Sequence, residues 1–227
     1  MAEDFRLVSQ IFELEKQFGE NLAILRLYQW NPFCISIGFH QTESLFDLEK
    51  IKRDGIGFIK RPTGGRAVFH ADELTYAFIE RASESNSTHY KKIHLTLAEA
   101  FSALGIQTDF QKTEPNFSET FSKIESAACF SASARYELEI NGRKLVGSAQ
   151  RRYQFNEGEV LLQHGSILLS QKHQDLAEYL LASDSLKTKI KDDLRMKTIS
   201  LSELPIPSIS TAKLSLAIEN SFKKAYG

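Results

Sequence analysis

Residues 61–70 read Arg-Pro-Thr-Gly-Gly-Arg-Ala-Val-Phe-His and run directly into Glu73-Leu-Thr-Tyr-Ala-Phe-Ile79, which has the composition of a strand. The glycine pair lets a backbone approach a ligand with no Cβ in between. The two flanking arginines carry guanidinium groups that can fix a carbonyl, a carboxylate or a phosphate. Alone, the segment is typical of an ordinary turn, and the surrounding sequence makes it a candidate ligand site.

Length and charge limit the classes of protein to which the chain can belong. Its 227 residues, 42% hydrophobic and 25% charged, predict one compact unit. With 28 basic and 29 acidic residues, it has no overall field to attract nucleic acid or an anionic membrane. It has neither an apolar run of about 20 residues nor a leader peptide, which predicts a cytoplasmic protein. Any anion that it binds must be held by a local group of basic residues or backbone N–H groups.

The cysteines and histidines do not follow a metal-binding pattern. Cys34 and Cys129 lie far apart in unlike surroundings, and the six histidines lack ligand spacing. We therefore expect no disulfide framework and no metal. Cys34, between Phe33 and Ile35 on a strand, is typical of a buried core thiol.

The order of the expected elements favours an α+β fold over a doubly wound sheet. Asn141-Gly142 between two strand-like runs is a strong hairpin signal. Ser44 with Asp47 predicts a capping box that opens a short helix closed by Gly55. Residues 83–88 and 112–133 are expected to be loops, the second one functional because of its length. Further helices are expected near 5–15, 93–104, 175–181 and 212–225, and strands at 22–30, 34–40 and 160–169, the last interrupted by a bend at His164-Gly165.

Several blocks together resemble the biotin/lipoate protein ligase superfamily, which includes octanoyltransferases. They are residues 61–70 with Glu73-Leu-Thr-Tyr76, then Arg143-Lys-Leu-Val-Gly-Ser-Ala-Gln150, Leu162-Gln-His-Gly-Ser-Ile167 and the stretch 28–41. The resemblance implies a class II aminoacyl-tRNA synthetase/biotin ligase-like catalytic domain with a mixed β-sheet flanked by helices. It would fill residues 1–227, with no accessory domain and with an N-terminal strand missing before Met1. It also implies a tunnel for a lipoyl or octanoyl chain.

Arg66 bears on the choice between an ATP-using ligase and a cysteine-dependent transferase. Ligases of this superfamily carry a third glycine where Arg66 follows the glycine pair, and a long side chain there would crowd an adenylate phosphate. Cys129 precedes the 143–150 block as in the octanoyltransferase branch. The resemblance therefore favours a transferase that uses no cofactor, with ATP and magnesium needed only for the ligase alternative.

The chemistry explains why a transferase would use Cys129 and Lys144. A thiolate splits acyl transfer into two easier steps through an acyl-enzyme. A nearby ammonium lowers the thiol pKa and supplies a proton to the departing thiol. Lys144, fifteen positions after Cys129, is the expected partner. The remaining expected site residues bind substrate: Arg61, Thr63, Gly64, Gly65, Arg66, Ala67, His70, Gly147, Ser148, His164 and Gly165.

The partners implied by the resemblance are octanoyl acyl carrier protein as donor and lipoyl-domain proteins as acceptors, such as the glycine cleavage H protein and E2 subunits. Arg61 and Arg66 would orient the pantetheine arm or the carrier surface. The expected state is a monomer. Three alternatives stay open: an ATP-dependent lipoate or octanoate ligase, an amidotransferase that moves octanoyl between lipoyl carriers, and a non-catalytic acyl-binding protein.

Overall fold

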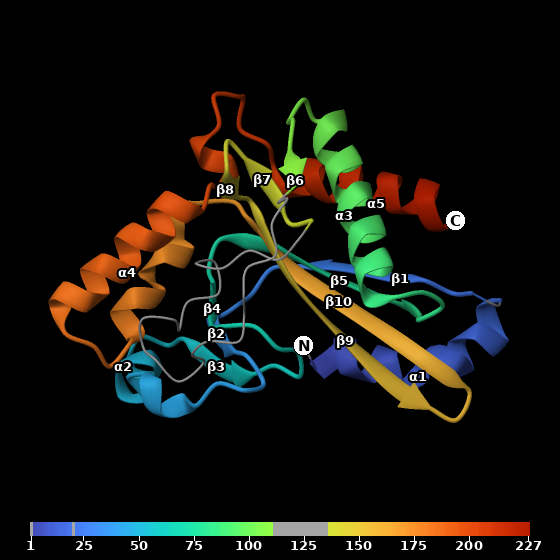
Figure 1. Cartoon of the computed structure of the whole chain (residues 1–227), viewed down its shortest axis with the longest axis horizontal. Helices are drawn as coiled ribbons and strands as arrows, with labels where there is room; N and C mark the ends of the chain where they lie inside the picture. The colour runs from blue at the N-terminus through green and yellow to red at the C-terminus, as the bar shows by residue number, and fades with distance from the viewer. Residues whose placement is uncertain (1, 20, 111–135) are drawn as a thin grey trace.

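The computed structural model describes residues 2–19, 21–110 and 136–227 (Figure 1). Its α-helices are α1 (Ala2–Phe18), α2 (Leu48–Arg53), α3 (Asn86–Ala103), α4 (Asp184–Lys197) and α5 (Thr211–Tyr226), and its 3₁₀ helices are η1 (Glu43–Leu45), η4 (Gln171–Tyr179) and η5 (Leu201–Glu203). The strands are β1 (Ile24–Tyr28), β2 (Cys34–Ile37), β3 (Gly57–Lys60), β4 (Val68–His70), β5 (Glu73–Arg81), β6 (Asp109–Phe110), β7 (Leu138–Ile140), β8 (Arg143–Lys144), β9 (Val146–Phe155) and β10 (Gly158–Leu168).

The strands form three sheets. The largest is antiparallel, with the order β1-β5-β10-β9. The second, β3-β2-β4, is mixed, because β2 runs parallel to β3 and antiparallel to β4. The third is the small antiparallel sheet β6-β7-β8. The α+β class is confirmed, with the strands divided among these sheets.

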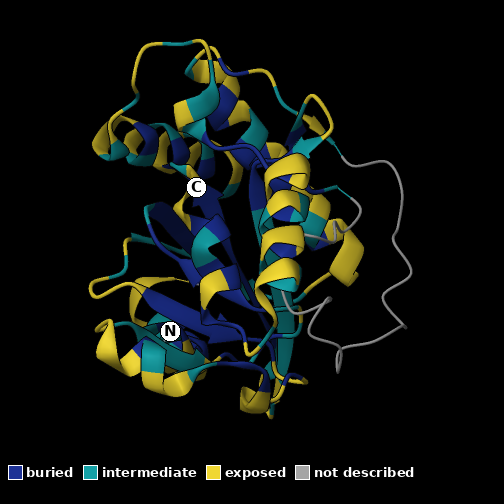
Figure 2. Cartoon of the chain, turned by 90° about the vertical axis from the view of Figure 1, so that its left-hand side faces the viewer, coloured by how far each residue is buried: buried dark blue, intermediate teal, exposed yellow. Residues whose placement is uncertain are grey.

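Alternation along β5 explains how the largest sheet is covered on both faces. Tyr76 and Phe78 pack into a cluster with α3 and α5, whereas Ala77 and Ile79 pack into a second cluster with α1. Successive side chains of a strand point to opposite faces, so an apolar β5 needs helices on both sides. A third cluster joins the β3-β2-β4 sheet to η4 and α4. Figure 2 shows the buried residues concentrated in the strands and the exposed ones on the outer helix faces.

The hairpin prediction is confirmed, and two expected boundaries are wrong. Asn141 and Gly142 have φ values of 52° and 72°, as a two-residue hairpin turn requires. The loop expected at 83–88 instead contains the start of α3, because the Ser85 side chain accepts a hydrogen bond from Thr88 N and caps the helix. Asp47 alone caps α2 through Lys50 N, with no part for Ser44.

The bend expected at His164-Gly165 is absent, since β10 runs unbroken from Gly158 to Leu168. Gly165 serves close packing instead: a Cβ there would lie 2.6 Å from Tyr76 Cε1 and 2.7 Å from Gly147 O. The expected 175–181 helix is the 3₁₀ helix η4, and α4 was not anticipated. The loop expected at 112–133 lies outside the described residues. None of the described helices is long and apolar enough to cross a bilayer.

Candidate functional site

A small pocket, with about 30 Å³ of enclosed space, lies between the largest sheet and the β3-β2-β4 sheet. Six of the expected substrate-binding residues line it: Arg61, His70, Gly147, Ser148, His164 and Gly165. The three blocks that are separate in the sequence therefore meet around one cavity. Such a concave site with few polar groups is the usual form of a small-ligand pocket.

Sequence reasoning missed several lining residues. Tyr28, Trp30 and Ser36 line the pocket from the stretch 28–41, which was noted only for its resemblance. Val68, Ala149 and Ser166 also line it, each next to an expected residue in the chain, and so does Thr75 from the Glu73-Leu-Thr-Tyr76 block. The available signal was strand alternation, because residues two apart on one strand share a face.

Arg61 holds the glycine turn from inside the fold. Only 4% of its surface is exposed. Its guanidinium donates to the carbonyl oxygens of Ser36 at 3.0 Å, Gly64 at 3.0 Å and Arg66 at 2.6 Å. Arg61 thus fixes the turn and contributes to the pocket wall, whereas Arg66 is half-buried nearer the surface. That either arginine orients a carrier stays a prediction.

Gly38 is a second determinant of the turn, and sequence reasoning did not single it out. A Cβ at Gly38 would lie 1.9 Å from the backbone oxygen of Gly65. The segment after β2 is bonded to the same turn, since Phe39 N donates to Thr63 O at 3.0 Å. The ligand turn and the end of β2 therefore touch backbone to backbone, which only glycine at position 38 allows.

Thr63 and Ala67, both fully buried, support the pocket from behind. Thr63 Oγ1 lies 2.7 Å from His164 Nε2 and so links the turn to β10. Burial, with smaller effects of Arg61 and His70, lowers the pKa of His164 to about 3. His164 is therefore a neutral polar residue of the pocket wall at physiological pH.

The stability of the fold is expected to fall as the solution is acidified below pH 6.5. Burial lowers the pKa of His94 to about 4 and that of His164 to about 3. Below their ordinary value of about 6.5, the unfolded chain binds protons that the folded chain does not. Each histidine then removes roughly 1.4 kcal/mol per pH unit until its folded pKa is reached. Urea unfolding between pH 7 and 4 measures this slope. A His164→Gln variant with the parent slope would contradict the assignment.

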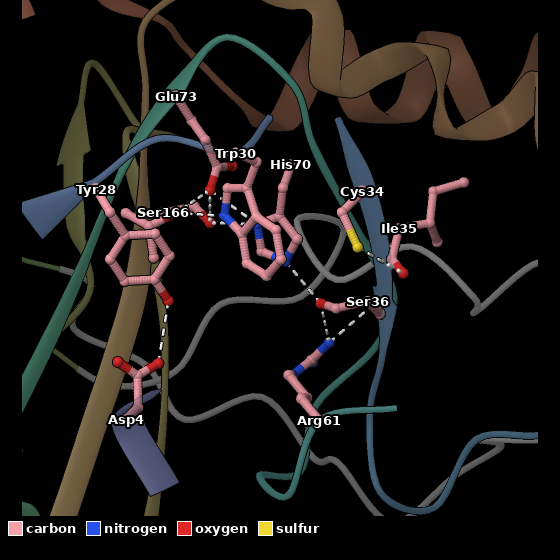
Figure 3. A network of polar contacts seen from close by, with 11 residues as sticks. Asp4, Tyr28, Trp30, Cys34, Ile35, Ser36, Arg61, His70, Glu73 and Ser166 are labelled. Atoms are coloured by element: carbon pink, nitrogen blue, oxygen red, sulfur yellow. Dashed lines mark hydrogen bonds and ion pairs between the residues drawn. The ribbon is translucent and has the colours of Figure 1, made fainter. Parts of the chain in front are cut away.

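A chain of short polar contacts joins Ser36, His70 and Glu73 (Figure 3). Ser36 Oγ is 2.7 Å from His70 Nε2, and His70 Nδ1 is 2.8 Å from Glu73 Oε1. The same Glu73 oxygen accepts from Thr75 Oγ1 at 2.6 Å and Ser166 Oγ at 2.8 Å. These contacts tie β2, β4, β5 and β10 together at the pocket.

This connectivity is that of a Ser-His-acid triad, but its surroundings do not fit nucleophilic catalysis. Ser36 is fully buried in the middle of β2, and Arg61 donates to its hydroxyl oxygen at 3.1 Å. The Trp30 ring stacks on His70, with centroids 4.4 Å apart. We interpret this series of polar contacts as a support that holds the His70 ring in the pocket wall.

Lys144 lies behind the pocket wall. Its side chain is 1% exposed, and Nζ is 2.7 Å from Glu137 Oε2, itself buried. The other Glu137 oxygen lies 3.4 Å from the backbone nitrogen of Ser148, a lining residue. Ser148 Oγ continues to Tyr76 OH at 2.6 Å and His94 Nε2 at 3.1 Å. Lys144 is thus connected to the pocket through Glu137 and Ser148. Lys144 and Glu137 are buried charges in direct contact.

Of the two cysteines, only Cys34 can be placed. It is 4% exposed, and burial raises the pKa of its thiol to about 12. An inert core thiol is therefore the correct interpretation. Cys129 lies outside the described residues, so its distance to Lys144 stays a prediction. Among residues 2–19, 21–110 and 136–227, no group of three or more His, Cys, Asp or Glu could hold a metal ion.

Comparison with known proteins adds to this geometry. Octanoyltransferase LipM of Staphylococcus epidermidis is 37% identical over 216 residues, covering 91% of this chain and 76% of that protein. The LipM of Geobacillus kaustophilus is 39% identical over 222 residues, with the same coverage.

The solved structures that resemble the chain agree in fold. A bipartite lipoate protein ligase described with its E2 lipoyl domain, from Thermoplasma acidophilum, superimposes with a TM-score of 0.70 at 18% identity, covering 98% of this chain and 78% of that one. A lipoate-protein ligase A bound with ATP gives 0.66 at 16% identity, covering 96% and 78%. The family model for the lipoyl protein ligase A/B catalytic domain matches residues 2–223. The chain belongs to the lipoyl protein ligase A/B catalytic domain family.

Proposed function

We propose that this protein transfers an octanoyl group from the thioester of acyl carrier protein to a lysine of a lipoyl domain, through an acyl thioester on Cys129. The observation that carries the proposal is the pocket itself. Three sequence blocks converge on it, and a buried lysine is held against its wall through Glu137 and Ser148. Relatives that share 33–39% of its residues are named octanoyltransferases.

The transfer takes two steps. The Cys129 thiolate attacks the octanoyl carbonyl, a new C–S bond forms, and the carrier thiol leaves with a proton. The amine of the acceptor lysine then attacks the Cys129 thioester, loses a proton and releases the Cys129 thiol as the amide forms. No step consumes ATP, because an amide is more stable than a thioester.

Lys144 would handle the proton in both steps. Its ammonium donates to the thiol that leaves first, and the resulting amine accepts the proton lost by the acceptor lysine. Glu137 keeps the Lys144 side chain in one position, with Nζ and Oε2 2.7 Å apart. A positioned general acid is more effective than a solvated lysine because it needs no rearrangement before the proton moves.

Incubation with octanoyl acyl carrier protein is expected to give a single octanoyl adduct on the protein, seen by intact mass spectrometry and removed by hydroxylamine. Peptide mapping should place it on Cys129. A Cys129→Ala variant should form no adduct and transfer no octanoyl to a lipoyl domain, whereas Cys34→Ala should behave as the parent. Transfer by Cys129→Ala without an adduct would overturn the covalent scheme.

Two rival activities predict different products. A ligase would release AMP from ATP and octanoic acid with no carrier present, and the ATP-bound structure that superimposes on this chain is of that class. Arg66, in place of a third glycine, disfavours it. An amidotransferase would use an octanoylated lipoyl domain as donor in preference to acyl carrier protein. Competition between the two donors separates these cases.

A further inference from the structure

An exposed aromatic ring lies between two cations beside the ligand turn. The Phe39 side chain is 49% exposed. The Arg151 guanidinium carbon lies 5.4 Å and the Lys60 nitrogen 5.8 Å from the centre of its ring. We call Phe39, Lys60 and Arg151 the cationic corner. A large apolar ring that stays in solvent beside positive charges is a common form of interaction site.

The corner adjoins the pocket through backbone contacts. Phe39 N donates to Thr63 O at 3.0 Å, and Arg151 Nη1 donates to Pro62 O at 2.6 Å. Both bonds go to the glycine turn segment whose Arg61 lines the pocket. Arg151 also lies two residues after the lining residue Ala149, on the same face of β9. A molecule that docks on the corner therefore sits at the rim of the pocket.

The chain segments that carry the corner contain basic residues and no acidic ones, although the chain as a whole is nearly neutral. The segments 33–42, 55–71 and 140–156 contain no Asp or Glu, but they hold seven Lys or Arg, three in 55–71 and four in 140–156. Some of these are neutralised or buried: Arg143 pairs with Glu203, Lys144 with Glu137 and Arg152 with Glu159, and Arg61 lies inside the fold.

Lys60 and Arg151 are not neutralised in this way. Among the described residues, neither has a carboxylate within ion-pair distance. Two cations without a described counterion flank an exposed ring at a pocket rim, in a protein with a net charge of −1. Local positive potential of this kind steers anionic partners.

We infer that the cationic corner docks the donor carrier by receiving the phosphodiester anion of its pantetheine arm. This inference rests on the proposed function, in which a carrier thioester enters the pocket. The charge selects the donor over the acceptor. The arm of the donor carries a phosphodiester anion, whereas the acceptor presents a lysine, whose ammonium the corner repels. Phe39 then packs against the apolar part of the arm or carrier.

Steady-state transfer with two donors tests the inference. The donors are octanoyl acyl carrier protein and the small thioester octanoyl-N-acetylcysteamine, which has neither phosphate nor protein. Lys60→Glu and Phe39→Ser are expected to raise the KM for the carrier about tenfold and to leave kcat and the KM for the small thioester unchanged. Lys60→Arg should restore the parent value. Raising the salt concentration should increase the KM of the parent for the carrier, and less so that of Lys60→Glu.

The control is Lys213→Glu, the same charge change at an exposed site on α5. It should behave as the parent with both donors. An equal change with both donors, or no change with the carrier, overturns the inference, and so does an increase in the KM of the lipoyl-domain acceptor alone. If the parent transfers octanoyl from neither donor, the proposed function itself fails, and the two failures are thereby distinguished.

Discussion

Replacing Lys144 with methionine is expected to lower octanoyl transfer by about 10²–10⁴-fold, the usual contribution of a positioned proton-transfer group. It is also expected to destabilise the fold by about 3–5 kcal/mol, because the buried carboxylate of Glu137 would lose the cation 2.7 Å from it. Both partners are nearly inaccessible, at 1% and 3% exposure, so solvent cannot replace the contact. Urea unfolding and transfer assays measure the two effects separately.

A double variant separates chemistry from stability. Lys144→Met with Glu137→Gln removes both buried charges and keeps an oxygen at position 137 to accept from the Ser148 backbone. Replacing both members of a buried pair costs far less than breaking it. The double variant should therefore recover most of the stability lost by Lys144→Met and none of the transfer. Recovery of transfer would show that Lys144 acts only through the fold.

Gly38→Ala is expected to destabilise the protein by at least about 3 kcal/mol and to disrupt the pocket. The new Cβ would lie 1.9 Å from Gly65 O. That oxygen belongs to the backbone, and the position of a Cβ is fixed by its own backbone, so no side-chain rotation can relieve the clash. Moving the turn would also strain the Arg61 bonds to Gly64 O and Arg66 O. Thermal melting gives the change in stability.

The neighbouring Gly64 provides the matched control. A Cβ at Gly64 would meet no atom within 4 Å. The free energy of unfolding of Gly64→Ala should therefore lie within a few tenths of a kcal/mol of that of the parent. A Gly38→Ala protein as stable as Gly64→Ala would mean that the turn and the end of β2 are not in contact.

The sequence predicted best those features that depend on neighbouring residues. The Asn141-Gly142 turn was a strong hairpin signal because few residues adopt positive φ at both positions. The blocks that line the pocket were identified as blocks, and six of their residues do line it. In both cases the signal is carried by residues close together in the chain.

Features that depend on distant contacts were not predictable. Gly38 looked like any strand-end glycine, since its need for no Cβ comes from Gly65, far along the chain. The pairing of Lys144 with Glu137 crosses a hairpin and is invisible in composition. The bend expected at Gly165 was wrong for the same reason. Glycine often breaks strands, but here Tyr76 and Gly147 occupy the space where its side chain would be.

The central position of β10 limits how the pocket can assist the reaction. The strand pairs with β5 on one edge and with β9 on the other, through the stretch that contains His164 and Gly165. Its peptide N–H groups are therefore already bonded within the sheet. Among residues 2–19, 21–110 and 136–227, donors for an oxyanion on the substrate carbonyl are therefore to be sought on the glycine turn or on side chains rather than on β10. In the described part of the chain, transition-state stabilisation is thus a task for the rim of the cavity rather than its base.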